Sequence, residues 1–327
     1  MRLSAIVPAT DTPATLARCR AAIEAAADGP DELIVVSETA RAGGPAAARN
    51  AGAARAAGDV LVFVDSDVAV HPDAFTRVRA RLGADPDLVA LIGSYDDAPA
   101  DAGTVSRFRN LLHHHVHQRS AGPVASFWSG LGAIRRDTFL AAGGFDEHTF
   151  VVSSMEDVEL GIRLAAAGAH IELDPELLGT HLKGWTLASM VHTDIVRRGV
   201  PWVTMLMRRG ELTSDLNLAW RHRAAAAGWV TAAGALALRR PGAAAGAAAL
   251  ATALNADFYA LLARRMGPAG AAAGIPLHAL HYLCASASVP LGVAAYLLGR
   301  AAAPDEPPDP AADAELPATP TEPVTRV

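Results

Sequence analysis

Two carboxylates follow directly on an apolar run in the segment Val62-Phe63-Val64-Asp65-Ser66-Asp67. Residues 59–64 are typical of a buried parallel strand, because the run is too short and too rich in β-branched side chains for a core helix. A buried strand does not carry unpaired acids into a core, so we expect Asp65 and Asp67 at its carboxyl end, where open α/β sheets bind ligands. Two hard oxygen donors there would suit a divalent cation that holds a diphosphate. An ordinary strand end followed by an Asx-type turn and a helix is the alternative interpretation.

A second acidic pair, Glu156-Asp157, stands at the start of a segment in which Leu160 and Leu164 have the spacing of one helix face. Negative charge at the start of a helix is favoured by the helix dipole, so helix electrostatics alone could explain the pair. The functional interpretation is a general base. A carboxylate can take a proton from an attacking hydroxyl if the two groups lie within hydrogen-bond reach.

Glycine and aromatic residues between the two acidic pairs could form a substrate surface. Within residues 127–136, Gly130 would let a substrate approach the backbone closely, and Trp128 could stack on a sugar or lipid head or could fill the core. Residues 143–147, Gly-Gly-Phe-Asp-Glu, are typical of a tight turn.

A histidine and several basic residues follow a short strand expected at residues 170–173 and a loop. A lone histidine is more often structural, but His181 could complete a metal site with the aspartates, and Lys183 could neutralise phosphate charge beside Trp185. Later arginines could do the same or could face anionic lipid heads: Arg197, Arg198, Arg208 and Arg209.

A histidine tract at residues 113–117, His-His-His-Val-His, resembles a metal-binding tract in composition. Consecutive histidines on a helix point in different directions, so we expect no compact zinc site there.

The order of apolar runs and periodic segments predicts a parallel, doubly wound α/β sheet. Strands are expected at residues 3–7, 33–36, 59–64 and 88–93. Helices are expected at residues 12–27, 45–57 and 72–82, the first with an N-cap at Thr10, Asp11 or Thr12.

The composition changes near residue 219, where three long, weakly polar stretches begin: residues 224–238, 242–263 and 269–298. The last two meet the length of about 20 residues that a membrane-spanning helix needs. An alanine-rich soluble bundle is the alternative, and Asn255 and Asp257 count against a clean span of the second stretch. That stretch could instead end in an interfacial helix with four residues at the headgroups: Phe258, Tyr259, Arg264 and Arg265. The proline- and acid-rich residues 304–327 predict a disordered tail.

Composition narrows the class of protein. The 327 residues suffice for a full α/β domain and more, and the net charge of −6 argues against a generic nucleic-acid binder. Cys19 and Cys284 lie far apart and form no metal-binding spacing, which fits a reducing compartment. The apolar stretch at residues 3–8 is too short for a signal peptide, so we expect the first domain in the cytosol.

Taken together, these motifs resemble a family 2 glycosyltransferase with the GT-A fold, over roughly residues 1–210. The resemblance is carried by Val7-Pro8-Ala9-Thr10, Glu38, Ala48-Arg49-Asn50-Ala51-Gly52, Asp65-Ser66-Asp67, residues 143–147 and Glu156-Asp157. Residues 181–202, with Thr186-Leu187, Asp194-Ile195 and Pro201-Trp202, are similar to a membrane-attached bacterial branch. The resemblance implies a Rossmann-like, mostly parallel sheet flanked by helices, followed by hydrophobic helices. It divides the chain into a GT-A domain (1–218), C-terminal membrane-embedded or interfacial helices (219–300) and the tail (301–327).

The resemblance also implies roles for individual residues. Pro8, Thr10 and Glu38 would line the nucleotide pocket, and Arg49 and Asn50 would lie near the nucleotide or donor sugar. Asp65 and Asp67 would flank Mg²⁺ or Mn²⁺ on the diphosphate, with Asp67 as the direct ligand and His181 completing the metal shell. Asp157 would be the base, with Glu156 beside it. Many members carry two acids after the second strand, whereas this chain has Ser37-Glu38, a departure in the base or ribose contacts.

The implied reaction is a single displacement that moves a sugar from a nucleotide-diphosphate sugar to a hydroxyl acceptor, a glycan or a lipid-linked molecule, at the cell membrane. Trp128, Gly130, Lys183 and Trp185 are the candidates for contact with the acceptor or a phosphate. Transfer to a polyprenyl phosphate is the alternative, because that acceptor is already ionised and needs no base. A catalytically silent, nucleotide-binding membrane scaffold is a third interpretation, which the intact acidic pairs oppose.

Overall fold

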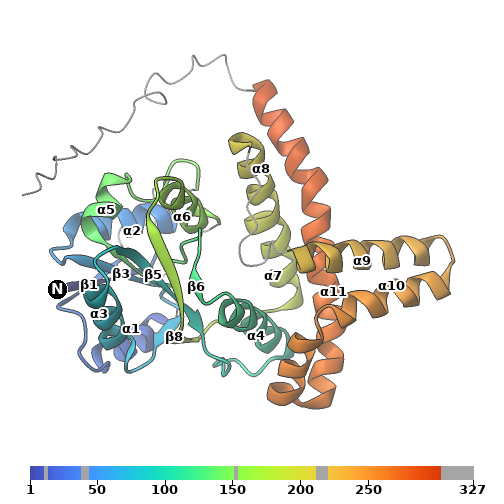
Figure 1. The fold of residues 1–327 in the computed structure, drawn as a ribbon, viewed down its shortest axis with the longest axis horizontal. Helices are drawn as coiled ribbons and strands as arrows, with labels where there is room; N and C mark the ends of the chain where they lie inside the picture. The colour runs from blue at the N-terminus through green and yellow to red at the C-terminus, as the bar shows by residue number, and fades with distance from the viewer. Residues whose placement is uncertain (11–13, 38–43, 151–153, 211–219, 303–327) are drawn as a thin grey trace, which may run out of the picture.

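The computed structural model describes residues 1–10, 14–37, 44–150, 154–210 and 220–302, and a mixed sheet forms the centre of its N-terminal part (Figure 1). The strands are β1 (Leu3–Pro8), β2 (Glu32–Val36), β3 (Val60–Val64), β4 (Val68–Val70), β5 (Leu88–Tyr95), β6 (Gly122–Pro123), β7 (Leu131–Arg135) and β8 (His170–His181). Their order is β2-β1-β3-β7-β5-β8-β4, and β6 pairs with β8. Strands β2, β1, β3, β5 and β8 run in one direction, and β7, β4 and β6 run against them.

The strands expected from the sequence are present, and the mostly parallel sheet that the resemblance implied is confirmed, with antiparallel strands added to it. The antiparallel strand β7 lies between β3 and β5 and pairs with both. It comes from the glycine-containing segment that the sequence suggested as a substrate surface. The strand expected at residues 170–173 continues through His181, so no loop separates that histidine from the sheet.

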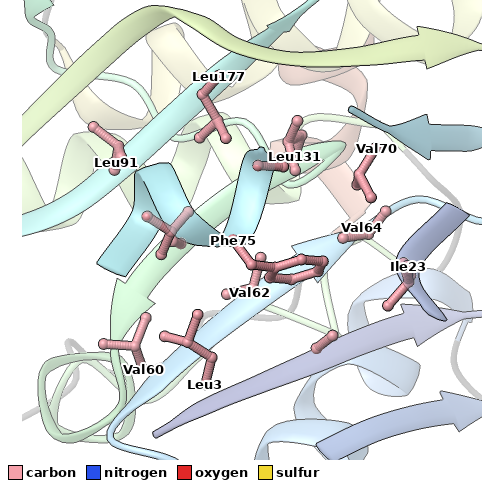
Figure 2. Packing of buried hydrophobic residues seen from close by; sticks show 14 of the residues in the cluster. Leu3, Ile23, Val60, Val62, Val64, Val70, Phe75, Leu91, Leu131 and Leu177 are labelled. Atoms are coloured by element: carbon pink, nitrogen blue, oxygen red, sulfur yellow. The ribbon is translucent and has the colours of Figure 1, made fainter. Parts of the chain in front are cut away.

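Alternating side chains bury both faces of the sheet. In β3, Val60, Val62 and Val64 belong to one core cluster, whereas Leu61 and Phe63 belong to another. Figure 2 shows the first cluster, which helices α1 (Leu16–Glu24) and α3 (Ala74–Ala84) cover. Helices α2 (Gly44–Arg55), α5 (Arg136–Ala141) and α6 (Glu156–Ala166) contribute to the second cluster. A strand buried on both faces is an apolar run, which explains why β3 could be recognised from the sequence.

Helix α1 is shorter than the sequence indicated. It begins at Leu16 after Thr15, which makes no side-chain cap, and ends before Asp28 adopts a positive φ of 49°. Thr10 lies in a turn rather than at a helix cap, and Asp11 and Thr12 lie outside the described residues.

The described residues from Leu187 onward are mainly helical and pack against α4 (Thr104–Arg119) of the sheet domain. The remaining helices are α7 (Leu187–His192), the π-helix η2 (Thr193–Gly199), α8 (Val200–Arg209), α9 (Trp220–Ala237), α10 (Pro241–Ala253) and α11 (Ala256–Ala302). Helices α9 and α10 form a hairpin that projects away from the sheet domain (Figure 1).

Helix α11 consists of two limbs, because Gly267 has the non-helical angles φ 76° and ψ 176°. The first limb contributes Phe258, Tyr259 and Leu262 to a buried cluster with Phe108 and Leu111 of α4. The alternative interpretation with Phe258 and Tyr259 at lipid headgroups does not fit this packing, since both side chains are buried in protein.

The stretch expected at residues 242–263 is interrupted between Ala253 and Ala256, so it forms no single span of 20 residues. Among the described residues, one helix, Ala256–Gly299, has the length and composition to cross a membrane. Length and composition alone fit a membrane span and a core helix alike. The tail expected at residues 304–327 lies outside the described residues.

Candidate active site

The first acidic pair lies in the turn between β3 and β4, at the carboxyl end of a buried strand. The backbone N–H of Asp65 donates to the carbonyl of Gly130 (3.1 Å), and the carbonyl of Asp65 accepts from Val68 (2.9 Å). The carbonyl of Asp67 accepts from the N–H of Leu182 (2.8 Å), which ties the turn to the end of β8. This location agrees with the sequence-based expectation, because the ends of β3 and β8 meet at one edge of the sheet.

His181 faces Asp67. The register of β4 and β8 pairs Val68 with His181, and Nε2 of His181 lies 3.8 Å from Oδ2 of Asp67. Burial opposes ionisation of Asp67, but the neighbouring His181 and the charge of Lys183 outweigh it, so the pKa of Asp67 is lowered.

The chemistry of this pair fits a divalent cation on a diphosphate. An ionised carboxylate and an imidazole nitrogen leave most of the coordination shell to phosphate oxygens and water, as Mg²⁺ and Mn²⁺ sites commonly do. No cluster of three or more histidine, cysteine or acidic side chains suited to a metal occurs in the described part of the chain.

Arg49 of α2 joins the two acidic pairs. Its Nη2 lies 2.6 Å from Oδ1 of Asp65, and its Nη1 lies 2.9 Å from Oε1 of Glu156. Arg49 and Glu156 are each 2% exposed. The sequence suggested a donor contact for Arg49, whereas its two terminal nitrogens are engaged with protein carboxylates.

Of the two acids in the second pair, Asp157 has the more accessible carboxylate. Its Oδ2 accepts from the backbone N–H of Ser129 (3.1 Å) and from the Ser129 hydroxyl (3.2 Å). Glu156, by contrast, is bonded through Oε1 to Arg49 and through Oε2 to the N–H of Ser154. Burial and the negative charge of Glu156 raise the pKa of Asp157 to about 6, although Arg49 pulls it down.

Asn50 holds the glycine turn at residues 143–147. Its amide donates to the carbonyl of Phe145 (2.8 Å) and to Glu147 (2.9 Å), and its oxygen accepts from the N–H of Phe145 (2.9 Å). Gly144 has a φ of 72°, and a Cβ there would lie 2.6 Å from Oδ1 of Asn50. These protein contacts occupy the amide that the sequence suggested for the donor.

The residues expected at the nucleotide lie around the end of β1. Pro8 is buried as the last residue of that strand, and Thr10 is partly exposed in the following turn. The N–H of Ala9 donates to the carbonyl of Val36 (2.9 Å), which keeps the ends of β1 and β2 together. Glu38 lies outside the described residues.

Trp128 and Gly130 lie beside the two acidic pairs. The Trp128 ring lies 4.9 Å from Tyr95, 4.6 Å from His113 and 5.3 Å from His117, measured between ring centres. A Cβ at Gly130 would lie 2.4 Å from the Trp128 ring, so the glycine allows the indole to lie over the backbone. Two histidines of the tract, His113 and His117, thus pack against the Trp128 ring.

Lys183 and Trp185 lie just beyond His181. The ammonium of Lys183 is 4.9 Å from the centre of the Trp185 ring, and the guanidinium carbon of Arg109 is 5.1 Å from it. The rings of His181 and Trp185 are 6.5 Å apart. The segment after β8 therefore brings a cation and an aromatic surface next to Asp67 and His181.

Of the later arginines, Arg209 pairs with Glu159 of α6 rather than presenting a free charge. Arg198 is exposed on η2.

Sequence reasoning missed Tyr95 and Ser129. The Tyr95 ring is stacked on His181, with centres 4.3 Å apart and planes at 22°. The strand expected at residues 88–93 ended two residues early, although a polar residue at the carboxyl end of a parallel strand is a signal that could have identified Tyr95. Ser129 had no local signal, because its role depends on the position of α6.

Residues 11–142 match the family described as glycosyl transferase family 2. This part of the chain is a family 2 glycosyltransferase domain. A pre-mycofactocin glycosyltransferase from Mycobacterium tuberculosis is 31% identical over 145 residues. That match covers 42% of this chain and 30% of the relative, so the chain spans well under half of the relative's length.

A solved structure shares the fold of the glycosyltransferase domain. The mannosyltransferase PcManGT from Pyrobaculum calidifontis, solved with GDP-Man and Mn²⁺, matches with a TM-score of 0.54 and 19% sequence identity. The match covers 91% of this chain and 88% of that one. The mixed, mostly parallel sheet flanked by helices is thus the GT-A fold.

Proposed function

We propose that this chain is an inverting glycosyltransferase that moves a sugar from a nucleotide-diphosphate sugar to a hydroxyl acceptor. The observation that supports this most strongly is the pair of acidic sites at one edge of the sheet, joined by Arg49. Asp67 and His181 have the chemistry to hold the leaving group, and Asp157 has the chemistry to handle the acceptor. GDP-Man and Mn²⁺, which the PcManGT structure holds, belong to the classes of donor and cofactor that we propose here.

In the proposed mechanism, the acceptor hydroxyl gives its proton to Asp157 while its oxygen attacks the anomeric carbon. The bond from the anomeric carbon to the diphosphate oxygen breaks in the same step, so the anomeric configuration inverts. A Mg²⁺ or Mn²⁺ ion bound by Asp67 and His181 would neutralise charge on the departing diphosphate. Lys183 adds a positive charge beside Asp67.

Ser129 and Glu156 prepare the base in this mechanism. The two hydrogen bonds from Ser129 fix the orientation of Asp157, and the buried charge of Glu156 favours its protonation. A base with a pKa near 6 is ionised at neutral pH and still accepts a proton readily. Arg49 compensates the charges of Asp65 and Glu156, which lets three acids lie close together.

The substitution Asp157→Asn tests the proposal. It preserves the shape and an acceptor for the Ser129 bonds but cannot take a proton, so we expect transfer to a hydroxyl acceptor to fall by about 10²–10⁴-fold. The measurement is sugar transfer with a panel of nucleotide sugars and Mn²⁺, with a chelator as the second arm. Glu147→Gln, on the turn that Asn50 holds, is the control for loss of a nearby carboxylate.

Near-normal turnover by Asp157→Asn would remove the base assignment. If that turnover occurred only with a polyprenyl phosphate, the alternative acceptor class would replace the hydroxyl. Lack of metal-dependent turnover by the wild-type protein with every donor would favour the scaffold.

We further propose that the C-terminal helices attach the protein to the cell membrane, with the glycosyltransferase domain on the cytoplasmic side, where nucleotide sugars reside. The α9–α10 hairpin supports this. No charged residue lies between Arg223 and Arg239 or between Arg240 and Asp257. Large apolar side chains are exposed along it: Leu236 66%, Leu238 72% and Leu250 62%. A helix that is apolar all round needs an apolar environment on every side, which a bilayer supplies.

A further inference from the structure

A buried carboxylate links α11 to the glycosyltransferase domain. Asp194 of η2 is 5% exposed, and each of its oxygens accepts a hydrogen bond from a different helix. Nη1 of Arg109 in α4 donates to Oδ1 at 2.7 Å, and Nδ1 of His281 in α11 donates to Oδ2 at 2.8 Å. We call Arg109, Asp194 and His281 the bridging triad. Its carboxylate fixes the guanidinium of Arg109 relative to α11, because charged hydrogen bonds are strong and directional.

The triad ends at a residue beside the candidate active site. The guanidinium carbon of Arg109 lies 5.1 Å from the centre of the Trp185 ring, and the ammonium of Lys183 lies 4.9 Å from the same ring. The N–H of Trp185 donates to the Ser106 hydroxyl at 2.7 Å, so its backbone is also held by α4. A cation over an indole face gives the ring a preferred position at a modest gain in free energy.

The electrostatics of the triad keep it together. Burial opposes the ionisation of Asp194, but His281 and Arg109 outweigh it and lower its pKa. Removal of His281 would leave one buried carboxylate oxygen without its donor, which is costly enough to favour movement of Asp194 or entry of water. Either response would loosen Arg109 beneath Trp185.

Docking of α11 does not require an ionic contact. The apolar cluster that Phe108 and Leu111 form with Phe258 and Leu262 already joins α4 to α11. A buried ionic group adds little net stability where apolar side chains could replace it. Its best-attested contribution is to fix the register of the elements that it joins. Asp194 also lies in a π-helix, a distortion found frequently at functional sites.

We propose that Asp194 and His281 are positioning residues that align Trp185 and Lys183 for the acceptor, so that α11 completes the acceptor side of the site. This inference rests on the proposed function and on the sequence-based expectation that Trp185 and Lys183 are candidates for contact with the acceptor. The C-terminal helices are then part of the catalytic unit as well as its membrane attachment.

The test uses the full chain in detergent or nanodiscs and compares His281→Ala, His281→Asn and Asp194→Asn. Asparagine at position 281 can place an N–H close to the position of Nδ1 and should rescue the alanine variant. Ser286→Ala is the matched control, because the Ser286 hydroxyl bonds only to the Tyr282 carbonyl of its own helix. Emission from Trp185, obtained by subtracting spectra of Trp185→Phe in each background, is the readout besides activity.

For His281→Ala and Asp194→Asn we expect the acceptor KM to rise by about 2- to 30-fold while the donor KM stays within about twofold. We expect the Trp185 emission to shift in both variants, and we expect His281→Asn and Ser286→Ala to match the wild type. An unchanged acceptor KM with unchanged Trp185 emission would overturn the inference. Equal losses for donor and acceptor, with a lowered unfolding temperature, would also overturn it and indicate a purely structural role.

Failure of the proposed function would look different. If the wild-type protein transferred no sugar, the proposed function would be refuted. The Trp185 emission would still show whether the bridging triad affects the position of Trp185. Unchanged emission in His281→Ala would then refute the contact between the triad and Trp185, whereas a shift that His281→Asn reverses would support it.

Discussion

Arg49 shows how the two acidic pairs can coexist at residue scale. Its guanidinium reaches Asp65 from one nitrogen and Glu156 from the other, across 107 positions of sequence in the second case. Three acids this close would otherwise repel one another strongly in a site with little water. Burial still raises the pKa of Asp65 despite Arg49, and burial together with the charge of Glu156 raises the pKa of Asp157 to about 6.

The pKa of about 6 for Asp157 predicts the pH dependence of activity. Because the base must be ionised, we expect kcat/KM to be constant above about pH 7 and to fall roughly tenfold per pH unit below about pH 6. The measurement is a pH–rate profile at saturating Mn²⁺, so that loss of the metal at low pH is not mistaken for protonation of Asp157. A profile that stays flat from pH 7 down to pH 5 would contradict the assignment.

The same raised pKa affects stability with a definite sign. Protonation of Asp157 stabilises the folded state, and that stabilisation is complete below the ordinary value of 3.8 and is lost as the pH rises through about 6. Asp157→Asn should therefore raise the unfolding temperature relative to the wild type more at pH 7.5 than at pH 4.

At the scale of elements, the ends of strands position the chemistry. The carboxyl ends of β3 and β8 bring Asp67 and His181 together, and the start of α6 brings Asp157 to Ser129. The sequence indicated β1, β2, β3 and β5 because apolar runs between turn residues are local signals. It did not indicate β7, since pairing of a short glycine-containing segment depends on neighbours that are distant in sequence.

The glycine turn that Asn50 holds offers a prediction at this scale. Gly143 and Gly144 both have positive φ, 77° and 72°, but only a Cβ at Gly144 would meet an atom at 2.6 Å, the Oδ1 of Asn50. We expect Gly143→Ala to cost about 1–2 kcal/mol from backbone strain alone. Gly144→Ala should cost more, because it also displaces the Asn50 amide.

Urea unfolding of both variants measures the difference, and Gly143→Ala is the internal control for strain. Equal costs would mean that Asn50 moves away freely. Because Asn50 follows Arg49 in α2, we expect Gly144→Ala to reduce activity as well, whereas Gly143→Ala should preserve it.

For the whole molecule, the main question is what surrounds the α9–α10 hairpin. It projects from the body of the molecule and leads into α11 (Figure 1). Near this junction the buried Tyr282 hydroxyl donates to Asn255 and accepts from His222. His222 lies near the start of α9 and Asn255 lies between α10 and α11, so this polar layer is at the end of the hairpin that joins α11. Such an arrangement suits the membrane attachment that we propose, with polar contacts at the interface and apolar surface pointing away.

We expect the full chain to float with liposomes in a density gradient and a variant with Leu236→Glu and Leu250→Glu in the hairpin to float poorly. Leu140→Glu is the matched control, because Leu140 is an exposed leucine on α5 of the sheet domain. Unchanged flotation of the hairpin variant would show that another surface binds the bilayer. A stable dimer without lipid would favour a second copy around the hairpin.

The sequence by itself determined strands β1, β2, β3 and β5, the two acidic pairs and the apolar character of the C-terminal region. These properties are encoded over a few residues, in periodicity and in turn chemistry. Only the tertiary structure decided that Arg49 bridges the pairs, that Tyr95 stacks on His181 and that His281 reaches Asp194. Such contacts depend on strand order and helix packing, which bring together residues that no local pattern relates.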